Sequence, residues 1–202
     1  MWRFCFMKSK RIFDFSTALL LILIVSPVLI ITAIIIIFSG HPPIYKSRRI
    51  GFNGCMFDCY KFTSMKEIST LSVEAQKNIM REVHENGHMK NDPRVTIFGK
   101  WIRKTSIDEL PQPFNILLGN MSLVGPRPIS QYEVDKYEKK LEYYKKSMPG
   151  ITGIWQVSGR DEVIYKRRVA MDILYYKKRS FSLDLFILLK TPSAVCKMSG
   201  VN

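Results

Sequence analysis

Two adjacent carboxylates, Asp108 and Glu109, stand in one short polar stretch of the sequence. Neighbouring carboxylates can bind Mg²⁺, and one of them can act as a nucleophile in group transfer. Ser106 and Glu109 have the spacing of a capping box, which predicts that a helix begins at Ile107 with both carboxylates in its first turn. Acidic residues at a helix start also simply complement the helix dipole, so this pattern alone leaves a structural role open.

Arg127 stands between two prolines, in the segment Gly125-Pro126-Arg127-Pro128. A residue before proline is pushed out of the α region, so Gly125 and Arg127 are both predicted to have a stiff, extended backbone. The planar guanidinium fork binds phosphate through two hydrogen bonds, and a stiff backbone lowers the entropy cost of holding it in place. The arginine therefore predicts a phosphate-bearing ligand near the two carboxylates.

Three longer motifs contain or follow these residues. They are Ser-Ile-Asp-Glu-Leu-Pro-Gln at 106–112, Met-Ser-Leu-Val-Gly-Pro-Arg-Pro at 121–128 and Pro-Gly-Ile-Thr-Gly-Ile-Trp-Gln-Val-Ser-Gly-Arg at 149–160. With these motifs the chain resembles the bacterial sugar transferases of the monotopic phosphoglycosyl transferase superfamily, from about Lys10 to about Lys190. Three long motifs in the family's order are far more specific than a single Asp-Glu pair.

The resemblance implies an enzyme that transfers a sugar-1-phosphate from a UDP-sugar to undecaprenyl phosphate, releases UMP and starts the assembly of a surface polysaccharide or glycoconjugate. It implies that Asp108 attacks the UDP-sugar, forming a covalent phospho-sugar aspartyl intermediate, and that Glu109 holds Mg²⁺. Both residues are therefore catalytic and metal-binding candidates. The substrate-phosphate candidates are Lys61, Arg103, Arg127 and Arg160. Asp172 is a supporting carboxylate, with a surface ion pair as the alternative.

The chain departs from the family pattern at several positions. Ser47 and Arg48 replace a usual Gln-Glu, Thr63 replaces an arginine, Pro113 a leucine and Asn120 an aspartate. Pro113 is expected to shorten the helix of the carboxylates. Asn120 lacks a carboxylate, which leaves the 108–109 pair as the better metal ligands. The sequence assigns no binding role at the other positions.

The composition fits anionic partners but does not choose among them. The 202-residue chain has 31 Lys and Arg against 17 Asp and Glu, a formal charge of +14. Nucleic acid, an acidic membrane face and a phosphorylated substrate would all be attracted. A membrane-anchored, basic nucleic-acid- or lipid-binding protein without catalysis is therefore the alternative function, although no nucleic-acid motif of known spacing occurs. The four cysteines form no Cys-x-x-Cys pair and predict reduced thiols rather than a metal site.

The uncharged, mostly apolar run from Phe15 to Phe38 is long enough to cross the hydrocarbon core of a membrane. Ser26-Pro27 interrupts the run and predicts a bend. Basic residues flank both ends of the run, and positive flanks stay in the cytoplasm. A re-entrant helix that bends at Ser26-Pro27 satisfies both flanks, as the resemblance also implies, whereas a straight crossing, the alternative, satisfies only one.

The remaining pattern predicts an α+β, predominantly helical fold. A hairpin is expected over 44–65 and helices over 72–85, 95–104, 131–146 and 163–176, followed by an interfacial amphipathic helix that includes Phe181 and Leu188. Residues 1–40 are predicted to be the re-entrant membrane helix and residues 41–202 a single catalytic domain. This domain is expected on the cytoplasmic face of the bacterial inner membrane.

The expected partners are a UDP-sugar, undecaprenyl phosphate and membrane lipids, with Mg²⁺ as cofactor and no nucleic acid. The oligomeric state, a homo-oligomer included, is left open. No motif encodes which sugar is transferred or which glycan pathway uses it, because pockets that distinguish two hexoses differ by contacts worth about 1–3 kcal/mol each.

Overall fold

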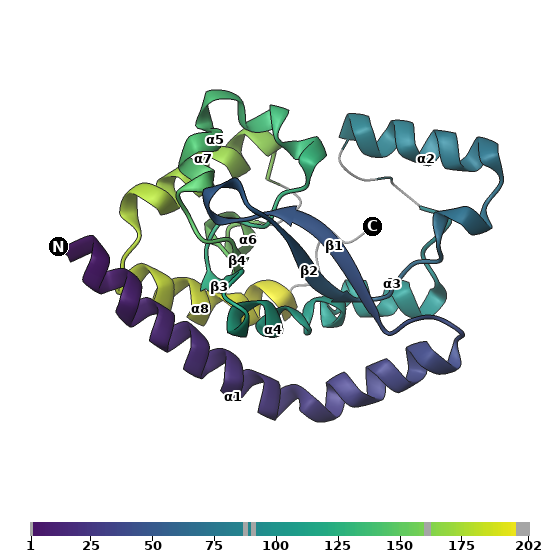
Figure 1. Cartoon of the computed structure of the whole chain (residues 1–202), viewed down its shortest axis with the longest axis horizontal. Helices are drawn as coiled ribbons and strands as arrows, with labels where there is room; N and C mark the ends of the chain where they lie inside the picture. The colour runs from purple at the N-terminus through teal and green to yellow at the C-terminus, as the bar shows by residue number, and fades with distance from the viewer. Residues whose placement is uncertain (1, 87–88, 90–91, 160–162, 197–202) are drawn as a thin grey trace.

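The computed structural model describes residues 2–86, 89, 92–159 and 163–196 of the chain. It confirms a mostly helical α+β fold with a long apolar helix at the N-terminus (Figure 1). The α-helices are α1 (Trp2–Phe38), α2 (Val73–Asn86), α3 (Ile97–Lys104), α4 (Gln112–Leu117), α5 (Leu141–Lys145), α6 (Ile154–Val157), α7 (Tyr165–Lys178) and α8 (Phe181–Cys196). Short 3-10 turns lie between several elements: η1 (Phe52–Gly54), η2 (Ile68–Thr70), η3 (Ile107–Glu109), η4 (Gln131–Glu133) and η5 (Asp135–Lys140).

Helix α1 runs unbroken through Pro27 and bends midway along its length (Figure 1). Proline has no N–H for the carbonyl four residues back, which here belongs to Leu23. The Ser26 hydroxyl donates to that carbonyl at 2.8 Å. Ser26 thus satisfies the backbone group that Pro27 leaves unbonded, so the interruption predicted at these two residues is a bend within one helix rather than a break.

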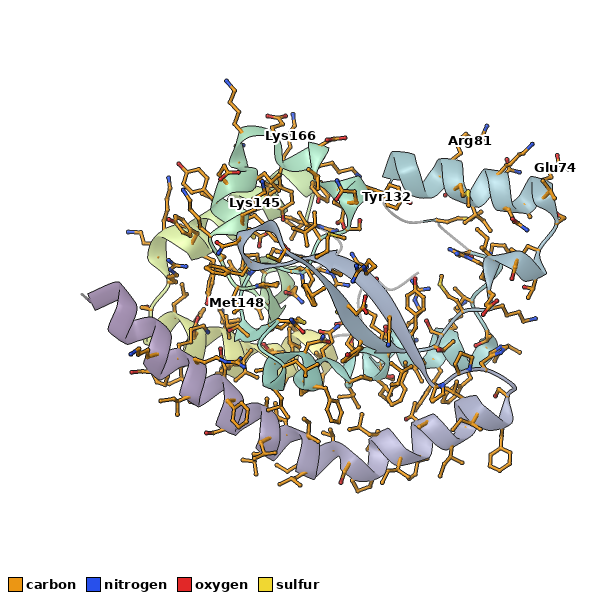
Figure 2. All side chains as sticks on the ribbon, in the orientation of Figure 1. Glu74, Arg81, Tyr132, Lys145, Met148 and Lys166 are labelled. Carbon is orange, nitrogen blue, oxygen red and sulfur yellow. The ribbon has the colours of Figure 1, made fainter. Side chains whose placement is uncertain are left out.

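Within the described part of the chain, residues 8–38 of α1 form the one helix long and apolar enough to cross a membrane, and only 11% of its most apolar window is buried. Helices α3, α4 and α8 lie beside α1 (Figure 1). They expose apolar side chains of their own: Ile97, Trp101, Phe114, Leu118, Phe181, Leu185, Phe186 and Leu189. Charged residues such as Glu74, Arg81 and Lys166 lie on the side of the molecule away from α1 (Figure 2). This separation is typical of a protein seated in a membrane surface.

Strands β1 (Ile44–Ile50) and β2 (Met56–Phe62) form the predicted antiparallel hairpin. The turn between them has left-handed backbone at Asn53 and Gly54, with φ of 55° and 78°. Asparagine and glycine adopt this conformation at low cost. The predicted turn residues are therefore confirmed. Each strand of the hairpin supplies residues to the pocket described below.

A second, parallel pair joins β3 (Ser122–Val124) and β4 (Gly150–Thr152). Just past β3 the backbones of Gly125 and Gly150 cross closely. A Cβ built on Gly150 would lie 2.1 Å from the Gly125 nitrogen, and one built on Gly125 would lie 2.2 Å from the Met148 carbonyl oxygen. No side chain fits at these distances, so both glycines are required. The crossing fixes the segment that leads into Arg127.

The single helix predicted over residues 131–146 is wrong. The segment is divided into η4, η5 and α5, and Glu138 within η5 has a left-handed backbone with φ of 49°. The Tyr137 ring lies in a buried cluster with Ile50 and Ile129. Turning the chain at Glu138 places this ring in the core while the neighbouring charges stay at the surface.

The buried hydrophobic side chains of the described residues form three clusters, and α1 takes part in two of them. Ala18 lies in a cluster with Ile116 and Ile187, and Ile36 lies in another with Phe62. Burying an isoleucine side chain contributes about 1.5–3 kcal/mol, so both halves of α1 are held against the rest of the chain. The boundary between a membrane helix of residues 1–40 and a catalytic domain of residues 41–202 stays a prediction.

Candidate active site

The two carboxylates stand on the 3-10 turn η3, between α3 and α4. The turn begins at Ile107, as predicted, but the expected capping box is wrong. Ser106 has a left-handed backbone, with φ of 58° and ψ of 17°, and makes no side-chain cap. A capping side chain needs extended backbone to reach the N–H groups of the following turn. A turn this short also carries little of a helix dipole.

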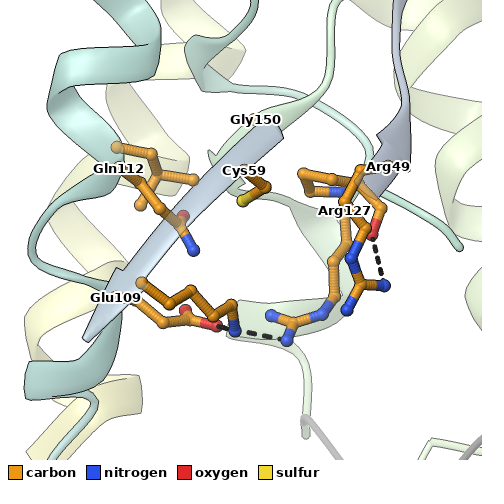
Figure 3. Close-up of a pocket in the computed structure, with 9 residues that line it drawn as sticks. Arg49, Cys59, Glu109, Gln112, Arg127 and Gly150 are labelled. Atoms are coloured by element: carbon orange, nitrogen blue, oxygen red, sulfur yellow. Dashed lines mark hydrogen bonds and ion pairs between the residues drawn. The ribbon is translucent and has the colours of Figure 1, made fainter. Parts of the chain in front are cut away.

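Lys61 and Arg127 meet at Glu109 (Figure 3). Glu109 Oε1 accepts from Lys61 Nζ at 2.7 Å and from Arg127 Nη2 at 3.1 Å. Asp108 Oδ2 lies 3.8 Å from Lys61 Nζ. Strand β2, the turn η3 and the segment after β3 thus bring together two carboxylates and two cations that the sequence predicted for the site.

The surroundings separate the pKa values of the two carboxylates. Burial raises the pKa of Asp108 to about 6, against the opposing charge of Lys61. Burial acts the same way on Glu109, but the charges of Lys61 and Arg127 outweigh it and hold the pKa of Glu109 well below its usual range. The position of Asp108 at the start of a turn therefore does not lower its pKa. Carboxylates whose environments push their pKa values apart commonly have different roles, and Asp108 is the more basic of this pair.

The pocket in Figure 3 is lined by Arg49, Cys59, Lys61, Glu109, Gln112, Arg127, Pro128, Gly150 and Ile151. No role was predicted from the sequence for Arg49, Cys59 or Gln112. Strand alternation offers a signal for Cys59, since residues two apart in β2 share a face and Lys61 is the next residue on that face. Burial raises the pKa of the Cys59 thiol, which keeps it protonated rather than nucleophilic.

Of the other predicted site residues, Arg103 and Asp172 are not among those that line the pocket. Arg103, in the last turn of α3, is not among the pocket residues, although its charge acts to lower the pKa of Asp108 against the effect of burial. Arg160 lies outside the described residues. Asp172 is buried and accepts from the Tyr137 hydroxyl at 2.6 Å, and burial raises its pKa to about 7. The surface ion pair considered for Asp172 is therefore wrong.

Residues 5–198, nearly the whole chain, match the family described as bacterial sugar transferase. The chain belongs to this family. Its relatives include an undecaprenyl-phosphate galactose phosphotransferase of Salmonella typhimurium, 42% identical over 195 residues, and the exopolysaccharide production protein ExoY of Rhizobium meliloti, 42% identical over 197 residues. An undecaprenyl-phosphate glucose phosphotransferase of Komagataeibacter xylinus is 38% identical over 198 residues.

The alignments cover 95%, 95% and 92% of this bacterial sugar transferase, and 41%, 87% and 35% of the three relatives in the same order. The chain thus spans less than half the length of the two phosphotransferases and most of the length of ExoY. Every residue that lines the pocket falls within the part that matches the family.

Three departures from the bacterial sugar transferase pattern lie on or beside the hairpin, and each has a partner. Ser47 Oγ accepts from Arg49 Nε at 3.0 Å. Arg48 pairs with Asp58 across the hairpin at 3.2 Å, at the surface. Thr63 donates to the carbonyl of a proline that precedes β1. Only the first of these contacts involves a residue of the pocket.

The other two departures lie on or after α4. Pro113 is buried in the first turn of that helix, where the missing N–H costs little. The carboxylates stand on the turn before α4, so the expectation that Pro113 shortens their helix is wrong. Asn120 follows α4 and is not among the pocket residues. The missing carboxylate at this position therefore takes no ligand away from the pocket.

Asp108 and Glu109 are the residues that could hold a divalent cation. Among the residues described, no group of three or more His, Cys, Asp and Glu side chains forms a ready metal site. Mg²⁺ commonly binds through one or two carboxylates and takes its other ligands from water and substrate phosphates. The pair fits this pattern if a substrate diphosphate supplies further oxygen ligands. The diphosphate would also have to replace Glu109 as the partner of Lys61 and Arg127.

Proposed function

We propose that this bacterial sugar transferase moves a sugar-1-phosphate from a UDP-sugar to undecaprenyl phosphate and releases UMP, which starts the assembly of a surface polysaccharide or glycoconjugate. Two relatives are named undecaprenyl-phosphate sugar phosphotransferases, and a third is named an exopolysaccharide production protein. The observation that carries the proposal is the buried carboxylate of Asp108 beside two cations that meet at Glu109. This arrangement holds a nucleophile next to a place for phosphate.

Asp108 is the nucleophile in the first step. A carboxylate oxygen attacks the β-phosphorus of the UDP-sugar, the bond from this phosphorus to the bridging oxygen breaks, and UMP leaves with the electron pair. A pKa of about 6 leaves Asp108 largely ionised at pH 7 and makes it more basic than an ordinary aspartate. The product is a phospho-sugar aspartyl ester.

Undecaprenyl phosphate completes the reaction. One of its phosphate oxygens attacks the same phosphorus, the bond to Asp108 breaks, and the carboxylate is restored as the lipid diphosphate sugar forms. The lipid phosphate is already ionised near neutral pH, so this step needs no general base.

Lys61 and Arg127 bind the phosphate oxygens in both steps. Their charges are paired with Glu109 in the structure, so a diphosphate must displace Glu109 from them. Arg103 and Arg160 stay phosphate candidates, and Asp172 a supporting residue. Mg²⁺ bound at Glu109 and Asp108 would neutralise the charge of the diphosphate.

The proposal includes a re-entrant α1 that enters and leaves the membrane on the cytoplasmic face of the inner membrane. Both halves of α1 pack against the same folded part of the chain, Ala18 near Ile116 and Ile36 near Phe62. A straight crossing would carry one of these contacts to the opposite face of the membrane. In the re-entrant arrangement, the soluble nucleotide sugar and the lipid both reach the pocket from the cytoplasmic side.

Cysteine labelling tests this topology. Single cysteines at Lys8 and at Ser47, in a cysteine-free background, should both resist an impermeant thiol reagent added from the periplasmic side, because both flanks are cytoplasmic. A cysteine at an exposed periplasmic site of another membrane protein serves as the positive control. Labelling of only one of the two positions would show that α1 crosses the membrane as a straight helix.

Catalysis itself separates the proposal from a membrane-anchored protein that only binds lipid or nucleic acid. Full-length protein in detergent, with Mg²⁺, undecaprenyl phosphate and a panel of UDP-sugars, should release UMP with at least one sugar and form the matching lipid-linked product. The sugar that reacts would also identify the substrate. Absence of UMP with every UDP-sugar would favour the binding protein.

A further inference from the structure

The end of β1 is bonded to the segment that follows Arg127. The Ile50 amide donates to the Ile129 carbonyl at 2.9 Å. The Tyr144 hydroxyl donates to the Ile50 carbonyl at 2.7 Å and accepts from the Ile129 amide at 3.1 Å. Tyr144 is buried, so water does not compete for these bonds. The backbone after Arg127 is therefore fixed by β1, just as the Gly125 crossing fixes the backbone before it.

Arg49 extends this connection into the pocket (Figure 3). Its Nη1 donates to the Pro128 carbonyl at 3.3 Å and lies 3.4 Å from Glu133 Oε2. Its Nε donates to Ser47 Oγ at 3.0 Å. Position 47 is where this chain departs from the usual glutamine, and the serine still supplies an oxygen to Arg49. Three groups thus hold the guanidinium through two of its nitrogens, Nη1 and Nε.

Glu133 is the anion that pairs with Arg49. Its Oε2 accepts from the amide and the hydroxyl of Ser130, each at 2.8 Å, which closes a capping box at η4. Its Oε1 accepts from the Tyr165 hydroxyl at 3.4 Å. A capping-box spacing alone indicates only a helix start. Here the same carboxylate also reaches an arginine of the pocket.

We propose that Glu133 and Arg49 form a clamp that positions Arg127. Glu133 fixes the Arg49 guanidinium, and Arg49 fixes the Pro128 carbonyl, the next residue along the chain from Arg127. The negative charge of Glu133 also offsets the repulsion between two guanidinium groups in one pocket. Both clamp residues act through Arg127 and are positioning residues. The inference rests on the proposed function, in which Arg127 binds a substrate phosphate.

A thermodynamic cycle tests whether the clamp acts through Arg127. Glu133→Gln is made in the wild-type chain and in the Arg127→Lys variant, and the affinity for UDP is measured by calorimetry on full-length protein in detergent at constant Mg²⁺. Arg127→Lys should weaken UDP binding about 30-fold, since it loses hydrogen bonds to a charged group. Glu133→Gln should weaken it about tenfold in the wild type and less than about twofold in Arg127→Lys, because residues in one network are not additive.

Two further variants keep the test decisive. Arg49→Lys retains the charge but loses the planar fork, and it should show the same loss of effect in the Arg127→Lys background even if Glu133→Gln does not fold. Arg48→Gln is the matched control, since Arg48 is the neighbouring arginine on β1 and its pair with Asp58 is exposed. It should leave UDP affinity unchanged.

The outcomes separate the clamp from the enzyme activity. Equal effects of Glu133→Gln, or of Arg49→Lys, in both backgrounds would overturn the clamp, because these residues would then act independently of Arg127. Coupling in UDP binding without UMP release from any UDP-sugar would retain the clamp and overturn the proposed function. UMP release from a UDP-sugar, together with equal effects of Glu133→Gln in both backgrounds, would support the proposed function and overturn the clamp. If the clamp acts through Arg127, Glu133→Gln and Arg49→Lys should raise the KM for the UDP-sugar in parallel with the loss of UDP affinity.

Discussion

Two groups of charged side chains in the described part of the chain can be compared, because they differ in whether a ligand could exchange into them. The pocket group is Glu109, Lys61 and Arg127, which line the pocket, together with Asp108, whose Oδ2 lies 3.8 Å from Lys61 Nζ. The junction group lies where α1 meets α8. There Lys10 Nζ is 2.6 Å from Asp184 Oδ2 and 3.7 Å from Asp14 Oδ1, while Ser122 Oγ donates to Asp14 and the Tyr175 hydroxyl donates to Asp184, each at 2.7 Å.

The pocket group is on the whole the more exposed of the two. In the junction group the side chains of Lys10, Asp14 and Asp184 are 13%, 4% and 3% exposed. In the pocket group those of Arg127, Glu109, Lys61 and Asp108 are 38%, 19%, 18% and 12% exposed. Charges with some access to solvent can exchange a carboxylate for a phosphate, whereas the junction charges can only hold each other. Similar residue types therefore serve binding in one place and attachment in the other.

Strand β3 connects the two groups. Its first residue, Ser122, donates to Asp14, and the carbonyl oxygen of its last residue, Val124, lies 2.9 Å from the Tyr175 hydroxyl oxygen. The chain then passes through Gly125 to Arg127. The junction group thus holds the strand from which the pocket arginine extends.

The largest effect is expected from Asp108→Asn, which removes the proposed nucleophile of the pocket group. With UDP-sugar and Mg²⁺ but no lipid, the wild type should release up to one UMP per active site and retain the phospho-sugar mass, and the variant should do neither. Turnover with lipid should fall about 10³-fold or more. Asp58→Asn, at a half-buried carboxylate that pairs with Arg48, is the control. UMP release that requires the lipid in the wild type would point to direct displacement.

A smaller effect, on stability rather than chemistry, is expected from Lys10→Met in the junction group. The variant leaves two buried carboxylates without their cation, which should lower the free energy of unfolding by about 3 kcal/mol. Denaturant unfolding in detergent measures the change, with Lys178→Met, at an exposed lysine, as control. Asp184→Asn added to Lys10→Met should recover part of the loss. If the free energy of unfolding falls by less than about 1 kcal/mol, water reaches the junction carboxylates as it reaches the pocket.

The smallest effect is expected from pH, and it acts through the pocket group. Asp108 attacks only when ionised, so with a pKa of about 6 the rate of the UMP burst should fall about tenfold from pH 7 to pH 5. Rapid-quench measurement across this range gives the midpoint. Asp172→Asn removes another carboxylate of raised pKa and should leave the midpoint in place. A flat profile would remove Asp108 from the role of nucleophile.

The local sequence pattern predicted the helices and strands better than the backbone conformation of the turns between them. The apolar run, the hairpin and the helices before and after the pocket follow from periodicity and turn residues, and they are confirmed. The motifs also indicated that Lys61 and Arg127 belong with the carboxylates. The left-handed backbone of Ser106 and Glu138 was missed, because neither residue is a type that favours it.

The contacts missed entirely are those between distant segments. Lys10 and Asp184 are separated by 174 positions, and Arg49 and Glu133 by 84. A pair at such a distance leaves no periodic pattern in the sequence. Each charge alone resembles an ordinary surface residue, and only burial distinguishes it from one. The resemblance to a family predicted a chemistry for the pocket but not the residues that hold the pocket in shape.

The separation of Lys10 from Asp184 also has a consequence for synthesis of the chain. Helix α1 is synthesised before α8, which carries Asp184. Lys10 and Asp14 therefore have no partner on α8 until that later helix has been made. The junction can close only after α8 has formed, and a chain truncated between α7 and α8 would leave the apolar helix α1 without this attachment.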